Sequence, residues 1–138
     1  MDYVNLMVLR DNEEILLSRT VYASSCSRIA ASICKYVSMY ETPLNMINRM
    51  LVDMFNINPI SYNDSNVEIK KSYSIVNDTK NIIVFKANFK SNFSIKSEKS
   101  TIFKMVPLEK VKNHVNLNKC QYTENTLLVL NNFFKEAK

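Results

Sequence analysis

The first apolar positions of the chain alternate with other residues in the two-residue period of a β-strand. Val4, Leu6 and Val8 form one such set, and a second apolar run follows at residues 15–17. Asp11 and Asn12 stand between the two runs, and both residue types favour tight turns. The pattern therefore predicts an N-terminal β-hairpin.

Residues 21–40 give two conflicting signals. Ile29, Ile33 and Val37 recur at the spacing of one face of a helix. The same stretch is rich in Ser, Tyr and Val, and the last two residue types favour strands. The pattern leaves both helix and strand open for this segment.

A helix is predicted over residues 42–55. Thr42 can cap its N-terminus, and Pro43 suits the first helical position because no backbone N–H is needed there. Apolar side chains fall three and four residues apart along this stretch, as on the core face of a helix: Leu44, Ile47, Leu51 and Phe55.

Two strands and a turn are expected after this helix. Apolar residues alternate over residues 67–75 and again over residues 83–89. Asn77 and Asp78 lie between the two stretches and favour a turn. The pattern predicts a second hairpin.

A strand and two helices complete the pattern. The strand covers residues 102–106, and Pro107 closes it and opens a brief helix through Val111. A last helix is expected over residues 123–136, with three apolar residues on one side: Leu127, Leu130 and Phe134. This order of elements predicts an α/β fold in which a mixed β-sheet lies between helices.

Length and composition favour one intracellular domain. The 138 residues are 46% apolar, enough for one buried core, so residues 1–138 are expected to form a single domain. The three cysteines make no even disulfide set and no metal-ligand cluster. Arg10 and Asp11 interrupt the N-terminal apolar run, so no signal peptide or membrane span is predicted. We therefore expect a protein of the nucleus or cytoplasm, without membrane association, metal or cofactor.

Glycine is absent from the whole sequence, whereas lysine is concentrated in its second half. P-loop and dinucleotide-binding folds need glycine where the backbone approaches phosphate, so both classes are excluded. The net charge is +5, and the stretch from Lys86 to Lys119 contains eight lysines against Glu98 and Glu109. This half could attract an acidic partner such as RNA, or form an ordinary solvated surface.

Residues 35–57 resemble the Nudix box, whose pattern is Gly, five residues, Glu, seven residues, Arg-Glu-aliphatic, one residue, Glu-Glu, one residue, Gly-aliphatic. Laid on without a gap, four positions match: Glu41, Arg49, Leu51 and Ile57. Asp53 is a conservative replacement for a glutamate. Four positions depart from the pattern: Lys35, Met50, Met54 and Asn56. The resemblance implies a Nudix-like α/β/α sandwich with a mixed β-sheet.

The departures change the chemistry that this resemblance implies. In the family, carboxylates one turn apart on the box helix gather Mg²⁺, which neutralises a diphosphate and helps to activate water. Met50 and Met54 would present thioethers on that face, and sulfur is a poor ligand for a hard cation. Asp53 alone cannot supply the oxygen ligands of Mg²⁺. The resemblance therefore implies a protein without catalytic residues, in which Glu41 and Arg49 form a structural pair that fixes the loop before the helix.

Within this superfamily, the chain is similar to the small subunit of cleavage factor Im, which acts in messenger RNA 3′-end processing. That group also has apolar residues at the positions of Met50 and Met54 and keeps an acid at that of Asp53. The resemblance implies a homodimer that binds short single-stranded RNA without cutting it and docks a larger protein. Where an aromatic residue would stack on a base, however, this chain has Ile29 and Ala30.

Three functions remain open from the sequence. The first is an RNA-binding or RNA-processing accessory, in which five lysines contact phosphates: Lys86, Lys90, Lys96, Lys99 and Lys104. Interleaved phenylalanines would stack on bases if exposed and build the core if buried: Phe85, Phe89, Phe93 and Phe103. The second is a structural, protein-interaction subunit of a ribonucleoprotein such as a ribosome. The third is a nucleotide-binding or weakly hydrolytic enzyme that uses the carboxylates of Glu41, Asp53 and Glu98.

Overall fold

The computed structural model describes residues 2–21, 28–38, 40–55, 67–77, 80–90, 93–96 and 100–136. Its elements follow one another in the order strands, helix, strands, helices. They are β1 (Asp2–Arg10), β2 (Glu14–Thr20), β3 (Ile33–Tyr36), α1 (Pro43–Phe55), β4 (Val67–Asn77), β5 (Lys80–Phe89), β6 (Thr101–Pro107), α2 (Leu108–Leu117), the 3₁₀ turn η1 (Lys119–Gln121) and α3 (Glu124–Glu136).

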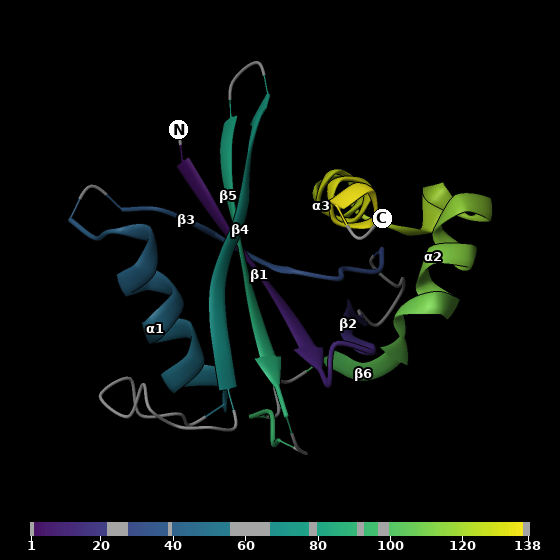
Figure 1. Cartoon of the computed structure of the whole chain (residues 1–138), viewed down its shortest axis with the longest axis horizontal. Helices are drawn as coiled ribbons and strands as arrows, with labels where there is room; N and C mark the ends of the chain where they lie inside the picture. The colour runs from purple at the N-terminus through teal and green to yellow at the C-terminus, as the bar shows by residue number, and fades with distance from the viewer. Residues whose placement is uncertain are drawn as a thin grey trace.

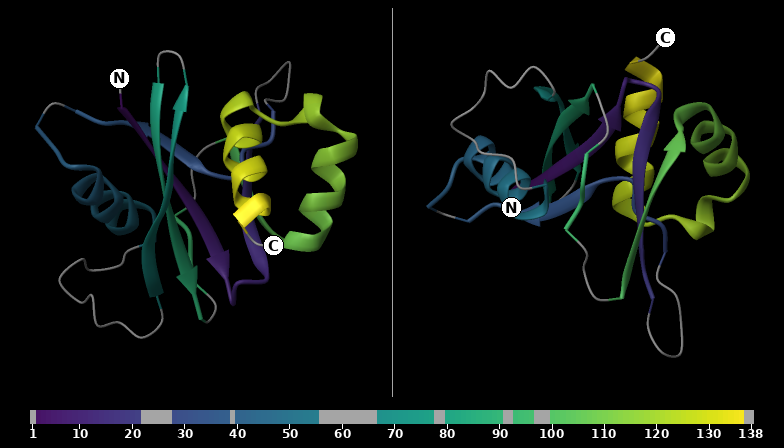
Figure 2. Two further views of the ribbon diagram at one scale, coloured as in Figure 1. Left: turned by 45° about the horizontal axis from the view of Figure 1, so that its top comes forward. Right: turned by 90° about the horizontal axis from the view of Figure 1, so that it is seen from below.

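The strands form one mixed sheet between two helical layers. Its order is β4-β5-β1-β2-β6, with β3 paired to β1 outside this path. β1 and β5 run parallel, and the other pairs are antiparallel. α1 lies on one face of the sheet, and α2 and α3 lie on the other (Figures 1 and 2). The predicted α/β/α sandwich with a mixed β-sheet is confirmed.

The N-terminal hairpin has the turn that the sequence predicted. Asp11 and Asn12 adopt φ angles of 53° and 56°. In a chain without glycine, Asp and Asn are the residues that enter this left-handed region most readily. β2 pairs with β1 only at the hairpin end, and β3 pairs with the other half of β1. β1 is thus shared between two antiparallel neighbours.

β1 is buried on both faces, which its alternation did not predict. Val4, Leu6 and Val8 pack on the α1 side, and Met7 and Leu9 pack on the α2 and α3 side. The parallel pairing with β5 places β1 in the middle of the sheet. Because helices cover both faces of the sheet there, apolar side chains can occupy both sides of the strand.

Residues 21–40, for which the sequence allowed either a helix or a strand, contain a strand. Ile33–Tyr36 forms β3, and Ile29 and Ala30 make isolated bridges to Tyr122 and Ser18. The residues of 21–40 that the structure describes contain no helix, so the four-residue spacing of the apolar residues was misleading there. Residues 22–27 and 39 lie outside the described ranges.

The second hairpin is confirmed as β4 and β5, and it contains a β-bulge. The pairing shifts between Lys71 and Tyr73. Because one extra residue reverses the direction of the following side chains, Val67 and Ile69 pack on the α1 side and Ile75 on the α3 side. The predicted turn residue Asp78 lies outside the described ranges.

The two C-terminal helices depart in detail from their predictions. α2 continues six residues beyond Val111, to Leu117, because Val115 buries a second turn against the sheet. α3 begins as expected, with Thr123 Oγ1 accepting a hydrogen bond from the Thr126 N–H at 3.2 Å. Its buried face includes the predicted Leu130 together with Val129 and Phe133, whereas Leu127 and Phe134 are only partly buried. None of the described helices has the length and apolar character needed to cross a bilayer.

Candidate functional site around the first helix

α1 begins where the sequence predicted. Pro43 is its first residue, and Thr42 Oγ1 accepts a hydrogen bond from the Asn45 N–H at 3.2 Å. This cap satisfies one of the free N–H groups of the first turn. The cap thus sets the residue at which the helix begins, and the helical period then sets the direction of each later side chain.

The core face of α1 is rotated from the predicted one. Ile47, Leu51 and Phe55 are buried as expected, but Leu44 is 50% exposed. Met46 and Met50 are buried in its place. The buried face of α1 is centred on Ile47 and Met50. Leu44, in the first turn, therefore lies at the edge of this face.

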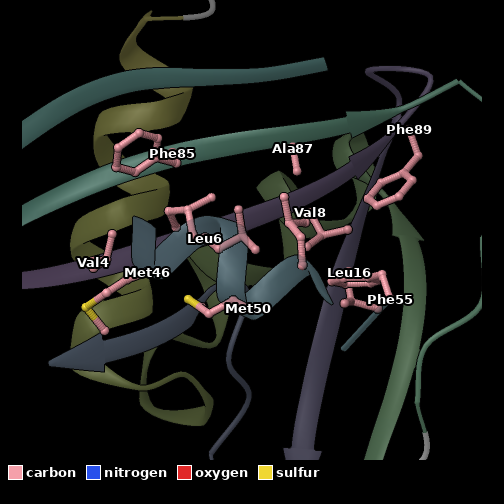
Figure 3. Close-up of a cluster of buried hydrophobic side chains, with 12 residues drawn as sticks. Val4, Leu6, Val8, Leu16, Met46, Met50, Phe55, Phe85, Ala87 and Phe89 are labelled. Carbon is pink, nitrogen blue, oxygen red and sulfur yellow. The ribbon is translucent and has the colours of Figure 1, made fainter. Parts of the chain in front are cut away.

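The two methionines of the box lie against the sheet. Met50 is 5% exposed and belongs to the core cluster under α1, as Figure 3 shows. Met54 is partly buried against the same cluster. The thioether of Met50 is thus buried against the sheet, whereas that of Met54 is only partly buried.

Asp53 lies on the outer side of α1 and lines a groove. The groove has a volume of about 470 Å³ and is bordered by α1 and by the segment after β5: Val52, Asp53, Met54, Phe55, Ser94, Ile95 and Lys96. The Lys96 N–H donates to the Met54 carbonyl at 2.8 Å and holds this segment at the helix end. The groove thus brings together a predicted box acid, Asp53, and a predicted RNA-binding lysine, Lys96.

The groove has the chemistry of a binding surface. It offers one carboxylate, one ammonium group and apolar walls. In the part of the chain that the structure describes, no three His, Cys, Asp or Glu side chains gather where they could hold a metal ion. Glu98, a third carboxylate considered from the sequence, lies outside that part.

Glu41 and Arg49 form the predicted ion pair. Arg49 Nη1 lies 2.7 Å from Glu41 Oε1, and the two side chains are 56% and 24% exposed. The pair joins the loop before α1 to the middle of the helix. Because it is solvated, it stabilises the loop only weakly.

Arg49→Ala is expected to lower the free energy of unfolding by at most about 1 kcal/mol, which corresponds to a few degrees in Tm. Differential scanning calorimetry at low and high salt measures this effect, and high salt should reduce it. Lys112→Ala, on the exposed face of α2, is the matched control. An unchanged Tm for Arg49→Ala at low salt would show that the pair contributes no stability.

The predicted RNA-binding lysines do not share one surface. Lys86 is half-buried on the α3 side of the sheet, whereas Lys96 lies beside α1 on the opposite side. Lys90 is exposed just after β5, and Lys104 is exposed on the edge strand β6. Lys99 lies outside the described ranges. Any contact with RNA would therefore use separate parts of the molecule.

The phenylalanines between these lysines build the core. Phe85 and Phe89 are buried, and Phe93 and Phe103 are partly buried against the same cluster. The rings of Phe89 and Phe93 are 4.2 Å apart between centroids, and both contact Phe55. Of the two interpretations open from the sequence, the core is therefore confirmed, and base stacking by Phe85 and Phe89 is wrong.

A second hollow, on the α3 side of the sheet, was not predicted from the sequence. It has a volume of about 110 Å³ and is lined by Leu9, Asn12, Glu68, Lys70, Lys86 and Asn88. These residues come from two hairpins that are far apart in the chain. The alternation of β4 and β5 could have indicated a polar row on one face, but it could not indicate which strands lie beside it.

No protein-family model and no curated protein sequence matches the chain. Its fold, in contrast, is similar to those of solved structures. DR0079 from Deinococcus radiodurans has 11% identity and a TM-score of 0.68, over 93% of this chain and 80% of that one. A Nudix family hydrolase from Clostridium perfringens has 15% identity and a TM-score of 0.60, over 99% and 97% of the two chains.

A structure from a study of MutT from Aliivibrio salmonicida and Vibrio cholerae has 11% identity and a TM-score of 0.56, over 82% of this chain and 86% of that one. At such identities the likeness shows the fold alone. The chain therefore has a Nudix-like fold.

Proposed function

We propose that this chain is a Nudix-like domain without hydrolase activity that serves as an RNA-binding accessory subunit. The observation that carries the first half of this proposal is the burial of Met50. Where the box pattern has a glutamate, this chain has a thioether that is 5% exposed and packed against β1 and β5. That position holds no oxygen ligand for Mg²⁺.

The remaining box acids do not compensate for this loss. Glu41 is engaged by Arg49 at 2.7 Å. Asp53 and Lys96 both line the groove on the outer side of α1. Mg²⁺ requires near-octahedral oxygen ligation, and the carboxylate of Asp53 alone cannot supply such a shell.

Positive charge supports RNA as the partner. The net charge is +5, and Lys90, Lys96 and Lys104 are exposed. Because Phe85 and Phe89 are buried and Phe93 and Phe103 are partly buried against the same cluster, binding would depend on phosphate contacts more than on base stacking. The resemblance to the small subunit of cleavage factor Im agrees with such a role, in which a dimer would dock a larger protein in messenger RNA 3′-end processing.

The proposal is tested by fluorescence anisotropy with a labelled single-stranded RNA in the presence of Mg²⁺. We expect binding that weakens with salt, with a slope of log K against log salt of about −2 for three lysine contacts. The triple substitution Lys90→Gln, Lys96→Gln and Lys104→Gln should bring this slope close to zero.

Turnover is measured on the same samples. The RNA should remain intact after incubation, and ADP-ribose and dinucleoside polyphosphates should remain uncleaved with Mg²⁺ or Mn²⁺. Turnover that disappears in Asp53→Asn would overturn the loss of hydrolysis. An absence of salt-sensitive RNA binding at micromolar protein would overturn the RNA role.

A second candidate is a structural subunit of a ribonucleoprotein, held by protein contacts. Leu44 and Val52 lie eight residues apart on one flank of α1 and are 50% and 37% exposed. Tyr36 in β3 is also half exposed. Apolar side chains on one flank of a helix are typical of a protein contact. Co-purification at native abundance separates the two roles, because a structural subunit should retain a stoichiometric protein partner after ribonuclease treatment.

A further inference from the structure

The hollow on the α3 side is built from two rows of side chains that lie across three strands. In the first row, Asn88 of β5 pairs with Leu9 of β1 on one side and with Glu68 of β4 on the other. In the next row, Lys86 pairs with Lys70. Directly paired residues point to the same side of a sheet, so the charged and amide groups of both rows are neighbours.

Two of the three charged groups in this hollow neutralise each other. Lys70 Nζ lies 2.8 Å from Glu68 Oε1. The hydrogen bond and charge of Lys70 lower the pKa of the Glu68 carboxyl, and Glu68 raises the pKa of the Lys70 ammonium group. Both groups therefore stay ionised at neutral pH, and their charges cancel.

Lys86 supplies the charge that is left over. It is half-buried, and its Nζ lies 5.5 Å from the centroid of the Phe133 ring in α3. Among the described residues it has no carboxylate partner within ion-pair distance. A cation held over an aromatic face loses part of its hydration, and this makes an anion from solution a favourable partner.

Asn88 adds a neutral donor to the same hollow. Its side chain is 9% exposed, and its Oδ1 accepts a hydrogen bond from the Asn12 N–H at 2.9 Å. This bond fixes the orientation of the amide and leaves its NH₂ group for another acceptor. Asn12 is itself held by the hairpin turn, with φ of 56°.

We propose that this hollow binds a phosphate monoester group, with Lys86 as its charge partner and Asn88 as a hydrogen-bond donor. A phosphate group offers only acceptor oxygens, as this set of donors requires. The volume of about 110 Å³ is several times the 10–15 Å³ that one water molecule needs. The phosphate could belong to a mononucleotide or to the 5′ end of an RNA, and the second source rests on the proposed function.

The site is tested by NMR titration of the ¹⁵N-labelled protein with inorganic phosphate and with AMP. We expect the largest amide shifts at Asn12 and Asn88. Lys86→Met should weaken phosphate binding at least tenfold, and Asn88→Asp should abolish it because it replaces the donor by a second carboxylate. Lys71→Met is the matched control, since Lys71 is exposed on the neighbouring strand β4 and pairs with Phe85, which belongs to the opposite face of the sheet.

Equal affinities of Lys86→Met and Lys71→Met for phosphate would overturn the site, provided that both spectra show a folded protein. Shifts that avoid Asn12 and Asn88 would also overturn it. If Lys86→Met is unstable, Lys86→Gln takes its place with the same expectation.

Two short RNAs, one with a 5′-phosphate and one with a 5′-hydroxyl, distinguish the sources. Tighter binding of the phosphorylated RNA by the wild type, but not by Lys86→Met, would support the RNA end as ligand. Binding of AMP without binding of either RNA would support the site and overturn the RNA role. Equal binding of both RNAs, unchanged in Lys86→Met, would support the RNA role and overturn the site as its phosphate contact.

Discussion

Met50→Glu is expected to lower the free energy of unfolding by about 3–5 kcal/mol at pH 7, rather than to restore a metal site. The substitution returns the residue type of the Nudix box to its position. Because Met50 is 5% exposed between α1 and the sheet, the carboxylate would enter an apolar core without a cationic partner. Urea denaturation followed by circular dichroism measures the loss.

The cost of Met50→Glu should depend on pH in a defined direction. Burial raises the pKa of a glutamate above its unfolded value of about 4.3. The folded state then holds the proton more tightly than the unfolded state, so stability falls as the pH rises. The loss is expected to be smallest below about pH 4 and to grow toward neutral pH.

Two control variants separate charge from packing. Met50→Leu keeps the volume and polarity of the site and should cost less than about 1.5 kcal/mol. Val52→Glu places the same charge where the side chain is 37% exposed and should cost less than about 1 kcal/mol. A Met50→Glu protein of wild-type stability with Mg²⁺-dependent hydrolysis would contradict both the core assignment and the proposed loss of activity.

Some features of α1 could be predicted from the sequence, and others could not. Its bounds and its cap could be predicted because Thr42 and Pro43 act locally. The pairing of Glu41 with Arg49 followed from the resemblance to the box. The direction of Met50 and Met54 could not be predicted, because a helix with apolar residues on more than half of its circumference has several possible core faces, and the sheet decides among them.

The lysines and phenylalanines show a different limit. Their alternation in β5 was visible in the sequence, but whether Phe85 faces solvent or α1 depends on which layer covers that side. The groove that joins Asp53 to Lys96 and the hollow that joins Lys86 to Asn88 depend on contacts between distant segments. Because their residues are far apart in the chain, no regular spacing in a single sequence indicates such sites.

β1 contains a buried polar residue, Asn5, whose burial the hydrophobic pattern of the sequence did not predict. Asn5 is fully buried, and its Oδ1 accepts hydrogen bonds from Ser32 Oγ at 2.9 Å and from Asn125 Nδ2 at 3.0 Å. It thus connects the central strand with the segment before β3 and with the first turn of α3. Its own Nδ2 has no partner within the described residues.

Asn5→Ala is therefore expected to lower the free energy of unfolding by about 2–3 kcal/mol, because two part-buried donors lose their acceptor. Urea denaturation measures the loss. The double variant with Asn125→Ala should cost less than the sum of the two single variants, since the second substitution removes a donor that the first has already left unpaired. Additive losses would show that Asn5 acts through its volume alone. A loss below about 0.5 kcal/mol would show that α3 is held to the sheet by its apolar face, Val129, Leu130 and Phe133, without help from this polar contact.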